Sequence, residues 1–161
     1  MIDRYKKKGG FFQLVQLIET TAKTKQEQFI QIILNENKVW GEAIVGKMLT
    51  TDRIITWSPE TLAEIFSRIQ TLTLAVFFQG RDQALIDRCL GAMSQAEKRK
   101  IFDLMDEKVA TPAERAHCHN RVITEVREFI KSGILKLEKI DPDLMIPENI
   151  EELLNQRAEN N

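Results

Sequence analysis

One short run of the sequence consists of residue types that bind transition metals, the consecutive His117, Cys118 and His119. Imidazole and thiolate groups are suitable ligands for zinc and copper. On an α-helix, however, His117 and His119 point about 200° apart, so their rings cannot share one ion without ligands from elsewhere in the chain. We therefore predict no metal site and no cofactor, and we interpret the three residues as polar surface positions on a helix.

The common short catalytic signatures are absent. The chain has no glycine-rich phosphate loop, no paired-cysteine motif, no HExxH and no GxSxG. Cys118 lacks a basic partner, because the two histidines flank it on the wrong faces of a helix. We predict that the protein is not an enzyme. A helical enzyme or metal protein centred on residues 117–119 is kept as an alternative, which a stoichiometric metal signal in purified protein would support.

Charged residues are concentrated in the segment 97–108. Basic residues come first and acidic residues follow, in the order Glu97, Lys98, Arg99, Lys100, Asp103, Asp106, Glu107, Lys108. A solvated helix face with i, i+4 pairs is the simpler interpretation of this pattern. The order nevertheless opposes the helix dipole, which favours acidic groups near the N-terminus and basic groups near the C-terminus. Charges placed against the dipole suggest contact with a partner.

Composition limits the protein class. The chain has 161 residues, of which 43% are hydrophobic and 29% charged, so it has enough apolar mass for one compact domain or two small ones. The formal net charge of -1 gives no basic excess for a nucleic-acid backbone. No apolar stretch approaches the roughly 20 residues that span a membrane. We expect a cytoplasmic protein with neither nucleic-acid binding nor membrane insertion, and its two cysteines do not suggest a disulfide scaffold.

Apolar residues recur at helical spacing along most of the chain. Three stripes predict a first block of three short helices, which ends near residue 50. In the second block, N-terminal helix signals occur at Ser58 with Pro59, at Ser94 with Glu97, and at Thr111 with Pro112. The pattern predicts about eight helices and no sheet.

Three segments have a less regular pattern. The run 72–78 is apolar on nearly every side and predicts a short buried helix, with a strand as the alternative. The segment 134–140 alternates apolar and charged residues, so we predict an extended conformation. A last amphipathic segment, 147–154, is followed by a polar end, 155–161, that we expect to fray.

Aromatic residues in the first block have two interpretations. Phe11, Phe12 and Trp40 belong to its apolar stripes. Burial in a core is the default interpretation. Because three short helices rarely close a core alone, a binding face made by these residues is the alternative.

The order of these features resembles the C-terminal domain of FliG, the flagellar motor switch protein. The resemblance is carried by Gly9-Gly10, by Lys47-Met48-Leu49 leading to Asp52, and by the segments 58–69, 74–80 and 92–95. It continues more loosely from Thr111 to Leu137. The resemblance implies an all-α fold, with an armadillo-like three-helix unit at 9–50, a charged bundle of about five helices at 51–140, and a C-terminal helical extension and tail at 141–161.

The resemblance also implies a function. In that family the Gly-Gly pair is a flexible linker, the first unit stacks on a neighbouring subunit or on another switch protein, and a charged helix meets the stator. We therefore expect a rotor component at the cytoplasmic face of the inner membrane, with the stator, other switch-complex proteins and a second copy of the chain as partners. The chain corresponds to one terminal domain of the family, so a fragment and a stand-alone paralogue both stay open.

Individual family positions are matched to different degrees. The paired aspartates correspond to the region of Asp103 and Asp106, and the arginine after the Gly-Pro turn corresponds to Arg115. The family's lysine and arginine are replaced by Gln79 and Ala96. Positive charge from Arg81, Lys98 and Arg99 would compensate. The predicted partner surface comprises Arg81, Lys98, Arg99, Asp103, Asp106, Glu107 and Arg115.

The hinge of the family corresponds to Met48-Leu49-Thr50-Thr51, which departs from the family's Met-Phe-x-Phe pattern. This departure and the two replaced charges support an alternative function, a divergent adaptor or regulator with the same fold that does not generate torque.

Overall fold

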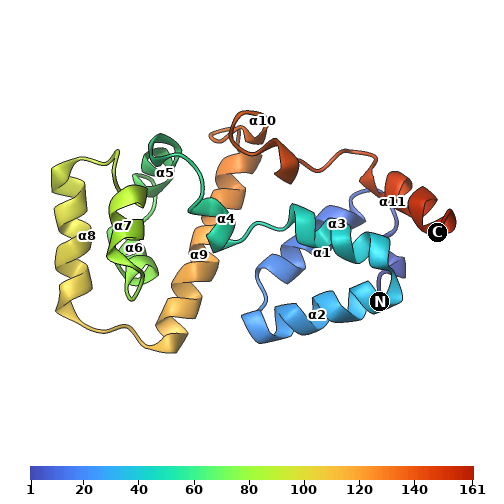
Figure 1. The fold of residues 1–161 in the computed structure, drawn as a ribbon, viewed down its shortest axis with the longest axis horizontal. Helices are drawn as coiled ribbons and strands as arrows, with labels where there is room; N and C mark the ends of the chain where they lie inside the picture. Colours follow the sequence, from blue (N-terminus) through green and yellow to red (C-terminus); the bar gives the residue numbers. More distant parts are fainter. The chain divides into compact units, whose positions relative to one another are not determined.

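The computed structural model describes residues 1–161 and contains eleven α-helices, two short 3-10 helices and no strand. The α-helices are α1 (Gly10–Glu19), α2 (Lys23–Glu36), α3 (Lys38–Lys47), α4 (Thr51–Ile54), α5 (Pro59–Phe66), α6 (Thr71–Phe78), α7 (Gln83–Cys89), α8 (Gln95–Glu107), α9 (Pro112–Lys131), α10 (Leu137–Ile140) and α11 (Ile150–Glu159), and the 3-10 helices are η1 (Asp3–Tyr5) and η2 (Pro142–Leu144) (Figure 1). The predicted all-α class is confirmed. No helix is both long and apolar enough to cross a membrane.

The chain divides into two compact units. Unit 1 comprises Met1–Leu49 together with Leu137–Asn161, and unit 2 comprises Thr50–Lys136. The chain therefore passes between the units twice, at 49–50 and at 136–137. The C-terminal segment, expected from the resemblance to be an extension, belongs to unit 1 and packs with its N-terminal helices.

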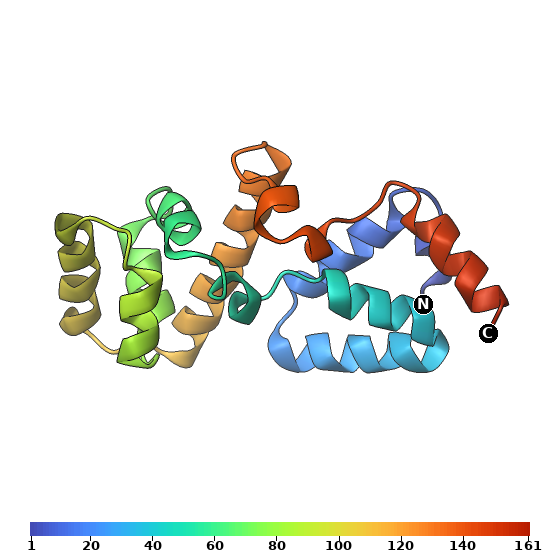
Figure 2. The same ribbon diagram turned by 45° about the horizontal axis from the view of Figure 1, so that its top comes forward.

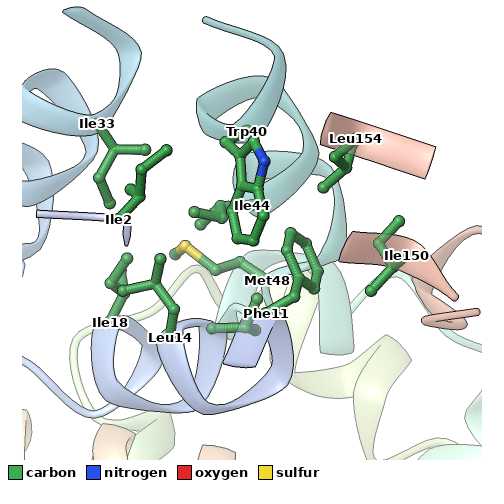
Figure 3. Close-up of a cluster of buried hydrophobic side chains, with 11 residues drawn as sticks. Ile2, Phe11, Leu14, Ile18, Ile33, Trp40, Ile44, Met48, Ile150 and Leu154 are labelled. Atoms are coloured by element: carbon green, nitrogen blue, oxygen red, sulfur yellow. The ribbon is translucent and has the colours of Figure 1, made fainter. Parts of the chain in front are cut away.

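Unit 1 is built around a single apolar cluster. Phe11 of α1 and Trp40 of α3 lie at its centre, with ring centroids 5.6 Å apart, and both side chains are fully buried (Figure 3). Helix α11 completes the cluster with Ile150 and Leu154, and both ribbon views show it alongside the helices that it covers (Figures 1 and 2). The first three helices do not have to close a core alone, because α11 supplies the missing apolar face.

Two polar contacts fix α11 in this position. The buried Glu151 carboxylate accepts a hydrogen bond from the Phe11 backbone N–H at 3.3 Å, and the Asn155 Oδ1 accepts one from Trp40 Nε1 at 3.1 Å. The first contact satisfies an amide that helix α1 leaves without an intrahelical partner, since its N-cap is Gly9 and makes no side-chain cap. The expectation that residues 155–161 fray is wrong for most of this segment, because α11 continues to Glu159.

The Gly9-Gly10 pair, which the resemblance led us to expect as a flexible linker, starts helix α1. Gly9 has φ +85°, a left-handed conformation that favours glycine, and it forms the N-cap of α1. A Cβ atom at Gly10 would overlap the backbone carbonyl of Tyr5. Both glycines are therefore required by a tight turn against η1.

Unit 2 is arranged around α6, which packs against both α8 and α9 (Figures 1 and 2). The predicted buried helix at 72–78 is confirmed. Its Phe77 and Phe78 rings lie 5.0 Å apart and both contact Phe66 of α5, at 6.3 and 5.3 Å. This aromatic cluster joins α5 to α6 within unit 2.

The three predicted N-caps of unit 2 are confirmed. The Ser58, Ser94 and Thr111 hydroxyl oxygens accept hydrogen bonds from the backbone N–H three residues later, at 3.1 to 3.2 Å. These bonds start α5, α8 and α9 at the positions that the sequence indicates. The end of α9, predicted at residues 132–133, is also confirmed, and Gly133 has φ +83° there.

One local prediction is wrong, and one polar run has a second role. The segment 134–140 is not extended, because Leu137–Ile140 forms α10 and no strand exists with which it could pair. The polar run 50–53 follows the end of the first block, as predicted, and also starts a short helix, since Thr50 Oγ1 accepts a hydrogen bond from the Arg53 backbone N–H and caps α4.

Candidate interaction surface

Helix α8 presents a charged outer face. Ile101 is buried on the side that packs against α6. Arg99, Asp103 and Asp106 have the i, i+4, i+7 spacing of one helix face, and their positions lie opposite Ile101. All three are exposed, and none of them forms an ion pair or a side-chain hydrogen bond. The face is therefore charged, solvated and unpaired within the chain.

The C-terminal turn of α8 is acidic. Asp106 and Glu107 are exposed there, and the last turn contains no basic residue. The following Lys108 pairs instead with Glu114 of α9, at 3.4 Å. Because the C-terminus of a helix has negative dipole character, these carboxylates reduce the stability of their own helix by about 0.3–1 kcal/mol each. The same arrangement produces a negative surface that attracts cations.

Lys98 and Arg81 are less exposed than the residues on the outer face of α8. Lys98 is half-buried on the flank of α8. Arg81 follows α6 and is half-buried, with its Nε donating to the Phe77 carbonyl at 2.9 Å and its guanidinium 4.4 Å from the Phe77 ring centroid. Burial lowers the pKa of Arg81, and Asp52 opposes this effect. An arginine so placed packs against its own core as well as carrying charge.

Arg115 is also separate from the outer face of α8. It lies on α9 and packs closely against the turn at Gly80. A Cβ atom added to Gly80 would be only 3.0 Å from Arg115 Nη1. Its Nε is buried without a hydrogen-bond partner. The structure thus divides the predicted surface. Arg99, Asp103, Asp106 and Glu107 are exposed on α8, and Lys98 is half-buried on its flank. Arg81 and Arg115 lie on the side of α6 and α9.

Gln79 is a residue whose role the sequence did not indicate. At the end of α6 its side-chain Nε2 donates to the carbonyls of Met105 at 3.0 Å and Lys108 at 2.6 Å. Its Oε1 accepts a hydrogen bond from the Ala110 backbone N–H. The replacement of the family's lysine was the only sequence signal at this position. The structure shows that the replacing residue joins α6 to the loop after α8.

The predicted apolar binding face needs correction at two of its three residues. Phe11 and Trp40 have no exposed surface, because they pack against each other beneath α11. They are core residues of unit 1. Phe12 is half-buried and lies outside that core cluster.

The residues matched to the family hinge lie at the boundary of the two units. Met48 and Leu49 are buried in unit 1, and the Leu49 N–H donates to the buried Glu19 carboxylate at 2.8 Å. Thr50 and Thr51 begin unit 2 as the cap and first residue of α4. Hydrogen bonds therefore hold the chain on both sides of the boundary at 49–50. A hinge motion of these residues stays a prediction.

The His117, Cys118 and His119 side chains do not form one site. His117 is exposed, whereas His119 is half-buried with its ring centroid 5.1 Å from that of Phe77 and its Nε2 3.4 Å from Arg81 Nη2. The interpretation of all three as surface positions is wrong for His119. No group of three or more potential ligand side chains is placed to hold a metal ion.

The environment of His119 predicts a pH-dependent stability. Burial, together with the nearby Arg81, lowers the pKa of His119 from its usual value of 6.5. The unfolded chain therefore binds the proton more readily, and this contribution to stability is lost as the pH falls from about 6.5 through the lower pKa of the folded state. We expect the melting temperature (Tm) to fall less between pH 7.5 and 5.5 in His119→Gln than in the unsubstituted protein. His117→Gln is the control, and the prediction is contradicted if all three Tm profiles are parallel.

No curated protein matches this chain. Among solved structures, full-length FliG from Aquifex aeolicus is similar, with 25% sequence identity and a TM-score of 0.48. The match covers 79% of this chain and 40% of the Aquifex protein, so the chain spans less than half of that relative's length. The model of the FliG C-terminal domain family matches residues 21–137, which include the caps, the α8 surface and the boundary between the units. The chain therefore belongs to the FliG C-terminal domain family.

Proposed function

We propose that this protein is a rotor or switch component of the flagellar motor, whose α8 surface contacts the stator for torque generation or switching. The observation that supports this proposal is the exposed and unpaired charge on the outer face of α8, held on a helix that packs against the core of unit 2. Membership of the FliG C-terminal domain family is consistent with it.

Electrostatics explains how such a surface would act. The net charge of -1 conceals a separation of basic and acidic groups along α8. Complementary charges steer association and select partners more than they add affinity, which suits contacts that form and break repeatedly. The acidic end, with Asp103, Asp106 and Glu107, fits a partner that presents basic side chains.

Other contacts belong to the same proposal. At the cytoplasmic face of the inner membrane, unit 1 would meet a switch-complex protein or a second copy of the chain. Phe11 and Trp40 are unavailable for this contact because they are buried. The exposed apolar side chains of unit 1 that are available include Leu17, Ile32 and Val45.

A double charge reversal tests the stator contact. We expect Asp103→Lys with Asp106→Lys to abolish or strongly impair swimming, because reversing two close charge pairs costs a contact about 3 kcal/mol or more. The Tm should stay equal or rise slightly, since lysine near the C-terminus of a helix is favourable. Swimming in soft agar, with Tm and helical circular dichroism of the purified variant, measures the two effects.

The matched control is Glu64→Lys with Asp87→Lys, which changes the net charge by the same amount at exposed positions on α5 and α7 of the same unit. This variant should swim normally. Normal swimming of the α8 variant would refute the stator contact.

An adaptor or regulator without torque generation is the second candidate function. It is favoured by Gln79, whose side-chain amide forms three hydrogen bonds within unit 2 at the position of the family's lysine, and by the uncharged Ala96. This candidate predicts that a deletion strain still swims. A paralysed deletion strain would exclude it.

A further inference from the structure

The side chain of Gln79 connects two parts of unit 2 that are distant in sequence. Its bonds reach Met105, Lys108 and Ala110, which are 26, 29 and 31 residues away. The Met105 carbonyl is one of the last four of α8, which lack intrahelical partners. Gln79 therefore caps the C-terminus of α8 and also holds the loop that follows.

The loop held in this way exposes an apolar side chain. Gln79 bonds to the residues on either side of Val109, and Ala110 is buried. Val109 itself is 80% exposed, more than any other large apolar side chain of the protein. Lys108, which pairs with Glu114, separates Val109 from the acidic turn that contains Asp106 and Glu107. A loop fixed on both sides thus presents an apolar group two residues after exposed carboxylates.

We propose that Gln79 is a positioning residue that fixes the loop after α8, so that Val109 makes an apolar contact in the same partner interface as the α8 charges. This inference rests on the proposed function for the identity of the interface. The partner chemistry that fits is a small apolar recess bordered by a basic side chain. We call the hydrogen bonds of Gln79 to Met105, Lys108 and Ala110 the glutamine clamp. By fixing the loop before contact, the clamp lowers the conformational entropy that is lost on binding.

The clamp is tested by hydrogen exchange of the full chain. Gln79→Met keeps the length of the side chain and removes its hydrogen bonds. The Ala110 amide, which donates to Gln79, should then exchange at least roughly tenfold faster, while the amides within α6 keep their protection. Gln83→Met is the matched control, because Gln83 bonds only to Asp87 on the surface of α7. Unchanged exchange at Ala110 in Gln79→Met would overturn the clamp.

The contact is tested by photocrosslinking in the native cell. The photoreactive residue p-benzoylphenylalanine is placed at position 103, at position 109, or at position 72, where the exposed Leu72 lies at the other end of α6. We expect positions 103 and 109 to crosslink to the same protein and position 72 not to do so. Adding Gln79→Met should reduce the yield from position 109 several-fold, and the yield from position 103 less.

The outcomes separate the two proposals. An adduct from position 103 without one from position 109 would overturn the Val109 contact and leave the proposed α8 surface intact. Equal yields from position 109 with and without Gln79→Met would overturn the positioning role. The absence of an adduct at both positions would refute the shared interface and the proposed function together, while the exchange of Ala110 still decides whether the clamp exists.

Discussion

Replacing Trp40 by alanine is expected to lower the free energy of unfolding of unit 1 by about 3–5 kcal/mol, because it leaves a large cavity in a fully buried site. The indole contacts Phe11 and also bonds through Nε1 to Asn155 of α11. Its loss therefore loosens the packing of α11 as well as that of α1 and α3. A loss of this size corresponds to a decrease in Tm of about 6–20 °C.

The control for Trp40→Ala is Asn155→Ala, which removes only the hydrogen bond. It should cost about 1–3 kcal/mol, since the buried indole N–H loses its partner. Thermal unfolding measures both variants, and hydrogen exchange of the α11 amides shows whether this helix detaches. If Trp40→Ala destabilises no more than Asn155→Ala, the core of unit 1 does not depend on the indole as proposed.

The replacement Phe77→Ala is expected to have an effect of similar size on unit 2, about 3–5 kcal/mol. The Phe77 ring contacts Phe66 and Phe78, and it also lies against His119 and the Arg81 guanidinium. Removing it leaves a cavity among side chains of α5, α6 and α9 and takes away the surface on which these two polar side chains pack. We therefore expect a large decrease in Tm.

The matched control for Phe77→Ala lies on the same helix. Leu72→Ala truncates a side chain that is 59% exposed and should change stability by no more than about 0.5 kcal/mol. Phe77→Leu, which keeps much of the volume, should have an intermediate effect. Equal Tm values for Phe77→Ala and Leu72→Ala would contradict the central position of α6 in unit 2.

Local sequence predicted the starts of helices well. The hydroxyl groups of Ser58, Ser94 and Thr111 cap the helices that follow them, because each cap involves atoms only three residues apart. The run 72–78, apolar on nearly every side, likewise predicted the buried helix α6. Local patterns failed where one pattern is compatible with two structures. Residues 134–140 alternate apolar and charged side chains as a strand does, yet Leu137–Ile140 forms the short helix α10.

Contacts between distant segments were not predictable in the same way. Nothing local to α11 indicates that Glu151 reaches the Phe11 amide, 140 residues away, or that α11 closes the core of unit 1. The charged residues show the same limit. The resemblance grouped Arg81 and Arg115 with the α8 charges, whereas the structure packs Arg81 against Phe77 and Arg115 against Gly80.

By itself, the sequence determined an all-helical chain with capped helices, an acidic turn at the end of α8 and a resemblance to the FliG C-terminal domain. These properties depend on helical periodicity and on contacts within one turn. The tertiary structure decided which charges stay exposed, that Phe11 and Trp40 are core residues, and that Gln79 holds the loop beside Val109. Such features depend on which helix faces meet, and sequence spacing cannot specify this when the partners lie tens of residues apart.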